Sequence, residues 1–219
     1  MIPSDPIAGA IRVSLEVSIV SLILAALPGI GSGLALGIER FRGRGALVSI
    51  LYTALAFPTV VVGLFVYFLL SRSGPFGSLG LLYTKTAMVI GQTILVAPIL
   101  ATFTLSAVKR LDPALTLTAR SLGASRLRLY LTLAREARFG ILAALIASFG
   151  RAISEVGVSM ILGGNIAGHT RTMTTVIALE HDKGQFHEAM ILGALLLAIS
   201  LCINIGFHVL QRDSEHRDD

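Results

Sequence analysis

The 219-residue sequence has no tryptophan, a single cysteine and few charged residues, which make up 14% of the chain. The lone cysteine, Cys202, excludes a disulfide framework within the chain, and its place in an apolar run predicts a core thiol. So few charges do not cover the surface of a soluble domain of this length. Without tryptophan, the four tyrosines are left as possible anchors at a membrane interface.

Motifs of nucleotide-binding and hydrolytic enzymes are also missing. The sequence has no Walker A motif, nucleophile elbow, His-Glu-x-x-His or dinucleotide fingerprint. The spacing of His169, His181 and His187 matches no common set of metal ligands. The net charge of +5 would suit nucleic acid, but the basic residues lie between apolar runs, as membrane-flanking charges do. We therefore expect no cofactor, no metal and no nucleic-acid partner for this chain.

Long apolar runs make up most of the sequence, and 54% of its residues are hydrophobic. Each of five runs reaches about 20 residues, enough to cross about 30 Å of hydrocarbon as a helix. The predicted fold class is an all-α integral membrane protein, with one domain over residues 1–219. The five predicted spans are residues 14–37, 46–70, 84–108, 140–162 and 190–210.

Basic residues are concentrated in two of the four connecting segments. Residues 39–45 carry three arginines and residues 109–138 carry seven lysines and arginines, whereas residues 71–83 carry one arginine. The positive-inside rule places the first and third connections in the cytoplasm. The N-terminus is then outside, and the tail at residues 211–219 is cytoplasmic.

Glycines recur at four-residue spacing in the first span, at Gly29, Gly33 and Gly37. Small residues at this spacing let two membrane helices approach closely. We therefore expect the first span to pack tightly against another helix.

The longest non-spanning segment, residues 111–138, has the pattern of two short amphipathic helices. Asp112 followed by Pro113 is a strong helix start, because aspartate accepts a capping bond and proline needs no donor. Gly123 suits the left-handed position after a helix end, and Ser125 can cap a second helix. The apolar residues on one face of the first helix are Leu111, Leu115 and Leu122. This segment predicts a docking surface.

The fourth span combines small residues with two charges. Arg151 and Glu155 are four residues apart and can pair, which lowers the cost of placing charge at membrane depth. Two interpretations stay open: an internal salt bridge that fixes helix packing, or the polar lining of a translocation path. Glu16 in the first span is a possible third member of this network. The polar residues on one face are Ser148, Arg151, Glu155 and Ser159; the small-residue stripe is Ala143, Ala147, Gly150, Ser154 and Gly157.

The segment after this span groups hydroxyl donors around one guanidinium. Its members are Thr170, Arg171, Thr172, Thr174 and Thr175. This chemistry suits an oxyanion or the surface of a partner protein.

The loop around Gly123 resembles the signature loop of binding-protein-dependent ABC importer permeases. That signature reads Glu-Ala-Ala, three residues, Gly, nine residues and Ile, with Leu-Pro shortly after. Ala119, Gly123 and Leu133 stand at the second alanine, the glycine and the isoleucine. Leu117 and Thr118 replace the glutamate and the first alanine, and the Leu-Pro pair is absent.

The following stretch, residues 148–180, resembles the corresponding region of molybdate, sulfate and especially tungstate importer permeases. In those families an Arg-x-x-x-Glu helix leads into a Gly-Asn-Ile loop and a threonine-rich segment. Arg151, Glu155 and Asn165 occupy these positions here.

The resemblance implies a MetI-like fold and a homodimer with a conduction path near the dimer interface. It implies a non-enzymatic permease subunit of an ATP-driven tungstate or molybdate-like oxyanion importer in the cell inner membrane. Partners would be two cytoplasmic ABC ATPase subunits, which would hold ATP and Mg²⁺, and an extracytoplasmic oxyanion-binding protein. Coupling to the ATPase would involve Leu115, Ala119, Arg120, Leu122, Gly123, Ala124 and Ser125. Residues facing the binding protein or the mouth of the path would be Asn165, Thr170 and Arg171.

Two alternatives belong to other classes. An integral-membrane enzyme would use Arg151, Glu155 and a histidine, and it would require a second acid or nucleophile that the sequence does not offer. A secondary transporter would work without ATP, but the chain lacks inverted repeats.

Overall fold

The computed structural model describes residues 6–215, with side chains described for residues 7–206. Within these residues the chain forms α-helices and one 3-10 turn, η1 (Gly77–Leu79), and no strand, which confirms the predicted all-α class. The first five helices are α1 (Pro6–Ile38), α2 (Arg44–Leu55), α3 (Thr59–Leu70), α4 (Lys85–Lys109) and α5 (Pro113–Ser121). The others are α6 (Arg126–Glu136), α7 (Arg138–Ile153), α8 (Gly157–Gly163), α9 (Met173–Asp182) and α10 (Phe186–Glu215).

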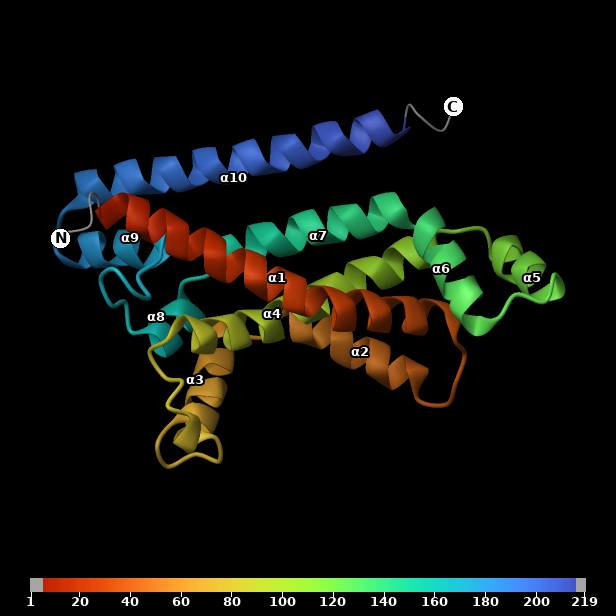
Figure 1. Cartoon of the computed structure of the whole chain (residues 1–219), viewed down its shortest axis with the longest axis horizontal. Coiled ribbons are helices and arrows are strands. Elements are labelled where there is room, and N and C mark those ends of the chain that lie inside the picture. The colour runs from red at the N-terminus through yellow and green to blue at the C-terminus, as the bar shows by residue number, and fades with distance from the viewer. Residues whose placement is uncertain (1–5, 216–219) are drawn as a thin grey trace.

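Three helices, α1, α4 and α10, are each long and apolar enough to cross a membrane. The pairs α2–α3 and α7–α8 meet the same criterion jointly, but they are bent by 101° and 56°. By length and composition the described residues supply up to five spans, if each bent pair is one span. Figure 1 shows α1, α4, α7 and α10 along the long axis of the molecule and α3 across it.

The predicted span 46–70 is therefore a broken helix. Pro58 is the N-cap of α3, with backbone angles of −61° and 123° that are extended rather than helical. Proline has no amide donor and also disfavours helical backbone at the preceding residue, here Phe57. Hydropathy does not register this break, because the residues on both sides of it are apolar.

The predicted span 140–162 is broken as well, between α7 and α8. The hydroxyl of Ser154 donates to the carbonyl oxygens of Gly150 at 2.9 Å and Arg151 at 3.1 Å. Side-chain bonds of this kind bend helices, because they compete with the backbone for its own acceptors. The chain then starts a new, shorter helix at Gly157.

The contact between α1 and α4 is built on the glycines of α1, as the four-residue spacing predicts. A Cβ atom at Gly33 would lie 2.6 Å from both the Ala101 carbonyl oxygen and the Thr104 Cβ. At Gly29 it would lie 2.7 Å from the Leu100 Cβ, so only glycine permits this approach of the two helices.

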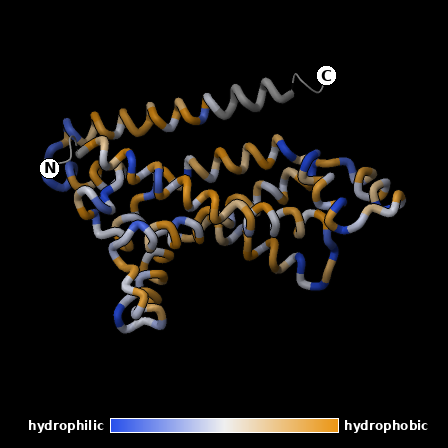
Figure 2. Tube along the Cα trace, in the orientation of Figure 1, coloured by the Kyte–Doolittle hydropathy of each residue, from blue (hydrophilic) through white to orange (hydrophobic). Residues whose placement is uncertain are grey.

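The two basic connections lie at the same end of the molecule, where α1 and α4 end and α5 and α6 begin. Leu34 and Ile38 of α1 pack there with Val108 of α4 and with Leu129 and Leu133 of α6. Figure 2 shows hydrophilic segments at both ends of the long axis and predominantly apolar helices between them. This arrangement fits a chain that crosses a membrane several times.

The last helix, α10, buries little of its surface against the rest of the chain. Only 11% of its most apolar window is buried within the described residues. Cys202 on this helix is exposed, so the predicted core thiol is wrong, because no described helix covers that side of α10. The side chains of the tail, residues 211–219, lie outside the described residues.

Candidate functional site

The segment between α4 and α7 forms the two short helices that its sequence predicts. The Asp112 carboxylate accepts a bond from the Ala114 amide at 2.8 Å, and Pro113 is the first residue of α5. Gly123 has a φ of 75°, the left-handed conformation expected after a helix end. Ser125 then caps α6 by accepting a bond from the Arg128 amide at 3.4 Å. We name residues 111–137 the α5–α6 loop.

The α5–α6 loop has an anchored half and a projecting half (Figure 1). Leu129 and Leu133 of α6 are buried against the ends of α1 and α4. Leu122, at the end of α5, is 82% exposed, and none of the described residues lies within 4 Å of a Cβ placed at Gly123. An exposed apolar tip of this kind is typical of a surface that contacts another protein.

The structure divides the seven residues expected to dock. Leu115, Arg120, Leu122, Gly123 and Ser125 are exposed, whereas Ala119 and Ala124 are half-buried. Ala119 packs, together with Leu111, against the anchoring cluster of α1, α4 and α6. The predicted apolar face of Leu111, Leu115 and Leu122 is therefore not one surface, because Leu111 belongs to the anchor and Leu122 to the tip.

Tyr130 joins the anchored half to the end of α1. Its hydroxyl donates to the Glu39 carboxylate at 3.4 Å. Burial, and then the negative charge and hydrogen bond of Glu39, raise the pKa of the Tyr130 phenol above its usual value, so the proton stays on the phenol at neutral pH. This contact fixes α6 to α1 by a polar bond as well as by packing.

Arg151 and Glu155 form the ion pair that the fourth span predicts, with 2.6 Å between Nη1 and Oε2. The other carboxylate oxygen accepts a bond from the Val158 amide at 3.0 Å, so Glu155 also caps the start of α8. The hydroxyl of Thr174 donates to the Glu155 carbonyl oxygen at 2.8 Å. Glu155 thus holds α7, α8 and α9 together at the bend, which favours the salt-bridge interpretation for its own side chain.

The polar face predicted for the fourth span is divided by the bend and by burial. Ser148 and Ser159 are fully buried, and Ser159 accepts a bond from Gln92 of α4 at 3.4 Å. The side chain of Glu155 is 3% exposed, whereas that of Arg151 is 38% exposed. Of the four residues predicted to form this face, only Arg151 has a partly exposed side chain.

Four of the five residues of the small-residue stripe face outward, and the fifth, Gly157, packs against the first turn of α3. Ala143, Ala147 and Ser154 are exposed, and a Cβ placed at Gly150 would have no neighbour within 4 Å in the described part of the chain. At these positions no helix of the described chain makes the tight packing that the stripe predicts.

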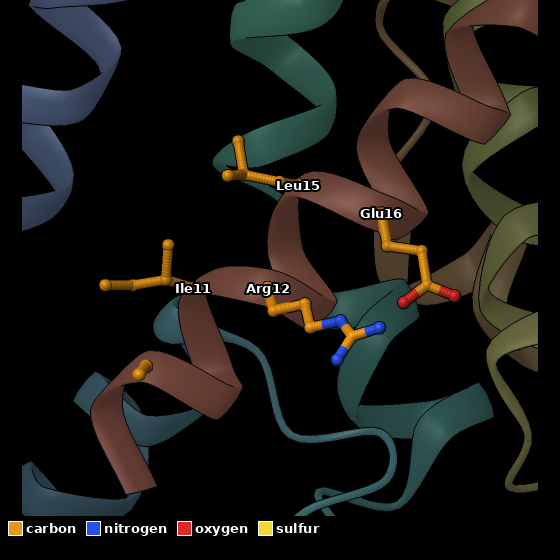
Figure 3. A pocket seen from close by; sticks show the side chains of 5 residues that line it. Ile11, Arg12, Leu15 and Glu16 are labelled. Carbon is orange, nitrogen blue, oxygen red and sulfur yellow. The ribbon is translucent and has the colours of Figure 1, made fainter. Parts of the chain in front are cut away.

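Glu16 is not part of the Arg151–Glu155 network. Its carboxylate bonds the Lys85 ammonium at 2.7 Å, because its side of α1 faces the first turn of α4. Figure 3 shows a shallow pocket beside it on α1, where Arg12 and Glu16 point away from Ile11 and Leu15.

The threonine cluster after α8 is an internal network and not an open set of donors. Thr170 is fully buried; its hydroxyl donates to the Gly163 carbonyl oxygen at 2.5 Å and accepts from the Ile166 amide at 3.0 Å. Thr172 and Thr175 form a capping box at the start of α9. In this structure these hydroxyls bond other groups of the chain, including the Glu155 carbonyl oxygen, so they are not presented to an anion.

The Arg171 side chain also bonds within this segment. It donates to the Asn165 carbonyl oxygen from both Nε and Nη2, at 3.3 and 3.2 Å, and to the Asn165 side chain at 3.1 Å. Asn165 has a φ of 51°, a left-handed conformation that asparagine tolerates better than most residues. Arg171 therefore closes the loop that leads from α8 to α9.

Replacing Thr170 by valine keeps the volume but removes both hydrogen bonds and leaves the Ile166 amide unpaired. We expect the free energy of unfolding to fall by about 1–3 kcal/mol, the cost of an unsatisfied buried group. Thermal unfolding in detergent measures it. Thr86→Val, at an exposed position near the start of α4, is the matched control, and an equal change in both variants would contradict the internal role of Thr170.

Two residues in this region were not singled out by the sequence. Tyr83 has a φ of 62°; its amide donates to the Leu162 carbonyl oxygen at 2.8 Å, and its ring lies where a Cβ at Gly164 would be. Tyr83 thus joins the α3–α4 connection to the end of α8. Gln92, the other one, is 2% exposed, and its lone amide within an apolar run was the signal that could have identified it.

His169, His181 and His187 do not converge. His181 lies against Asp182 at 3.4 Å and edge-on to the ring of Phe186. In the described part of the chain, no three histidine, cysteine or acidic side chains are grouped as metal ligands are.

Comparison with known proteins gives one family and several named relatives. The family model described as "Binding-protein-dependent transport system inner membrane component" matches residues 29–217. A probable anion ABC transporter permease protein of Haloferax volcanii is 45% identical over 197 residues, covering 88% of this chain and 85% of the relative. The tungstate uptake system permease protein TupB of Peptoclostridium acidaminophilum is 40% identical, covering 93% of this chain and 89% of the relative.

Solved structures with a similar fold are more distant in sequence. A bacterial alginate ABC transporter, in complex with a periplasmic protein bound to an alginate pentasaccharide, matches with a TM-score of 0.80 and 21% identity. The match covers 96% of this chain and 80% of that one. The MetNI methionine ABC transporter in an inward-facing conformation matches with a TM-score of 0.74 and 17% identity, over 93% of this chain and 94% of that one. At these identities the likeness concerns the fold alone.

Proposed function

This chain belongs to the family of binding-protein-dependent transport system inner membrane components, and from that premise we propose that it carries tungstate, or a similar tetrahedral oxyanion, into the cell. It is a multi-pass permease subunit of an ABC importer. The choice of tungstate is supported by relatives named as tungstate uptake permeases at 40% and 39% identity over 93% and 95% of this chain. A molybdate permease of Escherichia coli, by contrast, is 28% identical.

The observation that carries the coupling mechanism is the projecting tip of the α5–α6 loop. In our proposal the tip inserts into a cytoplasmic ABC ATPase. The ATPase, and not this chain, binds ATP and Mg²⁺. Contact would be made by the exposed residues Leu115, Arg120, Leu122, Gly123 and Ser125, with Ala119 and Ala124 behind them. Closure of the ATPase would then move α6 and, through the contacts of Leu129 and Leu133, the ends of α1 and α4. Alternating access of this kind is a shift between two conformations with different contacts.

The remaining parts of the assembly follow from the same family premise. The permease would act as a homodimer with two ATPase subunits, and the α5–α6 loop would face the cytoplasm with its basic residues. The opposite end, with Asn165, Thr170 and Arg171, would face an extracytoplasmic oxyanion-binding protein. Since the hydroxyl of Thr170 and the donors of Arg171 named above are used internally, these residues would shape that surface more than bind the anion.

The translocation path would pass the fourth span beside Arg151. Glu155 orients Arg151, while Ser148 and Ser159 lie behind the bend in the present conformation. They would line the path only after the helices rearrange.

Reconstitution in liposomes tests the proposal. The permease, its ATPase and the loaded binding protein are combined, and tungstate inside the vesicles is measured together with ATP hydrolysis. We expect uptake that requires both ATP and loaded binding protein. Uptake without ATP would instead support a secondary transporter, and hydrolysis that ignores loaded binding protein would contradict the importer.

A further inference from the structure

The breaks in the second and fourth spans meet at one point. Gly157, the first residue of α8, lies against the first turn of α3. A Cβ atom on Gly157 would be 2.9 Å from the Thr59 hydroxyl oxygen and 3.2 Å from a Val60 methyl group. The same Cβ would be 3.4 Å from the Glu155 carboxylate. Thr59 and Glu155 are thus neighbours, although they belong to different spans. We name this place the break junction.

Arg151 brings positive charge to the break junction. Its guanidinium has five N–H donors, and the hydrogen bond that the structure shows uses one of them, toward Glu155. The side chain is 38% exposed and lies on the outer part of α7, beside Ala147 and Ser154, which are also exposed. Unsatisfied donors are costly at membrane depth unless water or a ligand meets them.

Two polar groups near Arg151 and Glu155 have no partner in this conformation. Ser148 lies one turn before Arg151 on α7, is fully buried, and its hydroxyl is unpaired within the described chain. The side-chain carbonyl oxygen of Gln92 is also unpaired, while its amide contacts Ser159, one turn after Glu155. Buried polar atoms are rarely left unpaired, because they lose their bonds to water without gaining others. Both atoms are therefore available to water or a ligand in a conformation that exposes them.

We propose that the break junction is a transient binding site for the tetrahedral oxyanion in transit, with Arg151 as the charged donor and Thr59 as a second donor. This inference rests on the proposed function. A guanidinium suits oxyanions because its planar fork can bond two oxygens at once.

Glu155 has a second role at this site. Its negative charge, 2.6 Å from the guanidinium, offsets the attraction of Arg151 for an anion. A conducting site has to bind strongly enough for the ion to enter and weakly enough for it to leave. Glu155 therefore keeps the site weak, so that the anion does not remain at the break junction.

A double variant separates this role from a structural one. Arg151→Gln with Glu155→Gln removes both charges together and leaves no buried charge unpaired, so the fold should persist. We expect tungstate uptake per ATP hydrolysed to fall about tenfold or more, the loss of a hydrogen bond to a charged group, while ATP hydrolysis still responds to loaded binding protein. Arg12→Gln, an exposed arginine on α1, is the control and should transport as the wild type does.

A measurement on the single variant Glu155→Gln stands independently of uptake. In the purified complex with the ATPase, sodium tungstate should raise the thermal midpoint of this variant more than that of the wild type, because Arg151 has lost its counter-charge. The double variant should show no such rise, and sodium chloride at equal ionic strength should give none in any variant.

The outcomes distinguish the two proposals. If the wild type and the double variant take up tungstate equally well, the break-junction site is overturned, but the proposed importer function is not. The break-junction site is also overturned if tungstate raises the thermal midpoint of Glu155→Gln no more than that of the wild type. This second test does not depend on the double variant folding. A wild type that takes up no tungstate overturns the proposed substrate itself.

Discussion

A chain with leucine in place of Gly33 is expected to lose the close contact between α1 and α4 and, with it, much of its folded stability. A Cβ atom at this position would lie 2.6 Å from the Ala101 carbonyl oxygen, a backbone atom that cannot rotate away. Relief requires α1 and α4 to separate along their whole contact. We expect a destabilisation of about 3 kcal/mol or more, at the upper end for overpacked cores. Thermal unfolding in detergent measures it.

The matched control for this variant lies two residues earlier on the same helix. Gly31 is exposed, and among residues 6–215 nothing described lies within 4 Å of a Cβ placed there. Gly31→Leu adds the same side chain to α1 and raises helix propensity equally, but at a position whose Cβ has no close neighbour in the described structure. A similar midpoint for the two variants would show that the glycine contact does not limit stability.

Aspartate in place of Gly123 is expected to weaken binding of the ATPase at least about tenfold without unfolding the permease. A Cβ at Gly123 would meet nothing within 4 Å in the part of the chain that the structure describes, so the internal cost there is backbone strain at a φ of 75°, about 1 kcal/mol. A carboxylate at the apolar tip would have to be buried unpaired in the interface. We expect the Kd for the ATPase to rise at least about tenfold, since such burial costs more than about 1.4 kcal/mol.

Gly184→Asp controls for strain and charge together. Gly184 has a φ of 76°, and a Cβ placed there would have as few neighbours as one at Gly123. It lies between α9 and α10, at the opposite end of the molecule from α5. Co-purification of the ATPase in detergent gives the comparison. Retention of the ATPase by both variants would exclude Gly123 from the docking surface.

The sequence predicts the α5–α6 loop well, because its determinants are local. Asp112, Pro113, Gly123 and Ser125 each fix the backbone within a few residues of themselves, and each is found in the predicted role. The glycine contact of α1 was predictable for a similar reason: its spacing alone determines that one face of the helix carries no side chains.

The breaks and the threonine cluster were not predictable in the same way. Residues on both sides of Pro58 are apolar, so hydropathy counts one span where the chain turns by 101°. A hydroxyl such as that of Thr170 is a donor in any context, and whether it meets a ligand or the backbone depends on the fold of the loop. The partner of Glu16 was missed because Lys85 is distant in sequence and adjacent only in space.

The sparse packing of α10 has a consequence for which substitutions the chain tolerates. Leu197 and Leu201 are exposed by 72% and 60%, so within this chain their shape matters little and their hydrophobicity a great deal. Exchanges among leucine, isoleucine and phenylalanine at these two positions should be neutral in a mutational scan of the isolated subunit, whereas charged residues should not. In the assembled complex, a position on α10 where shape also matters would identify a surface that another protein covers.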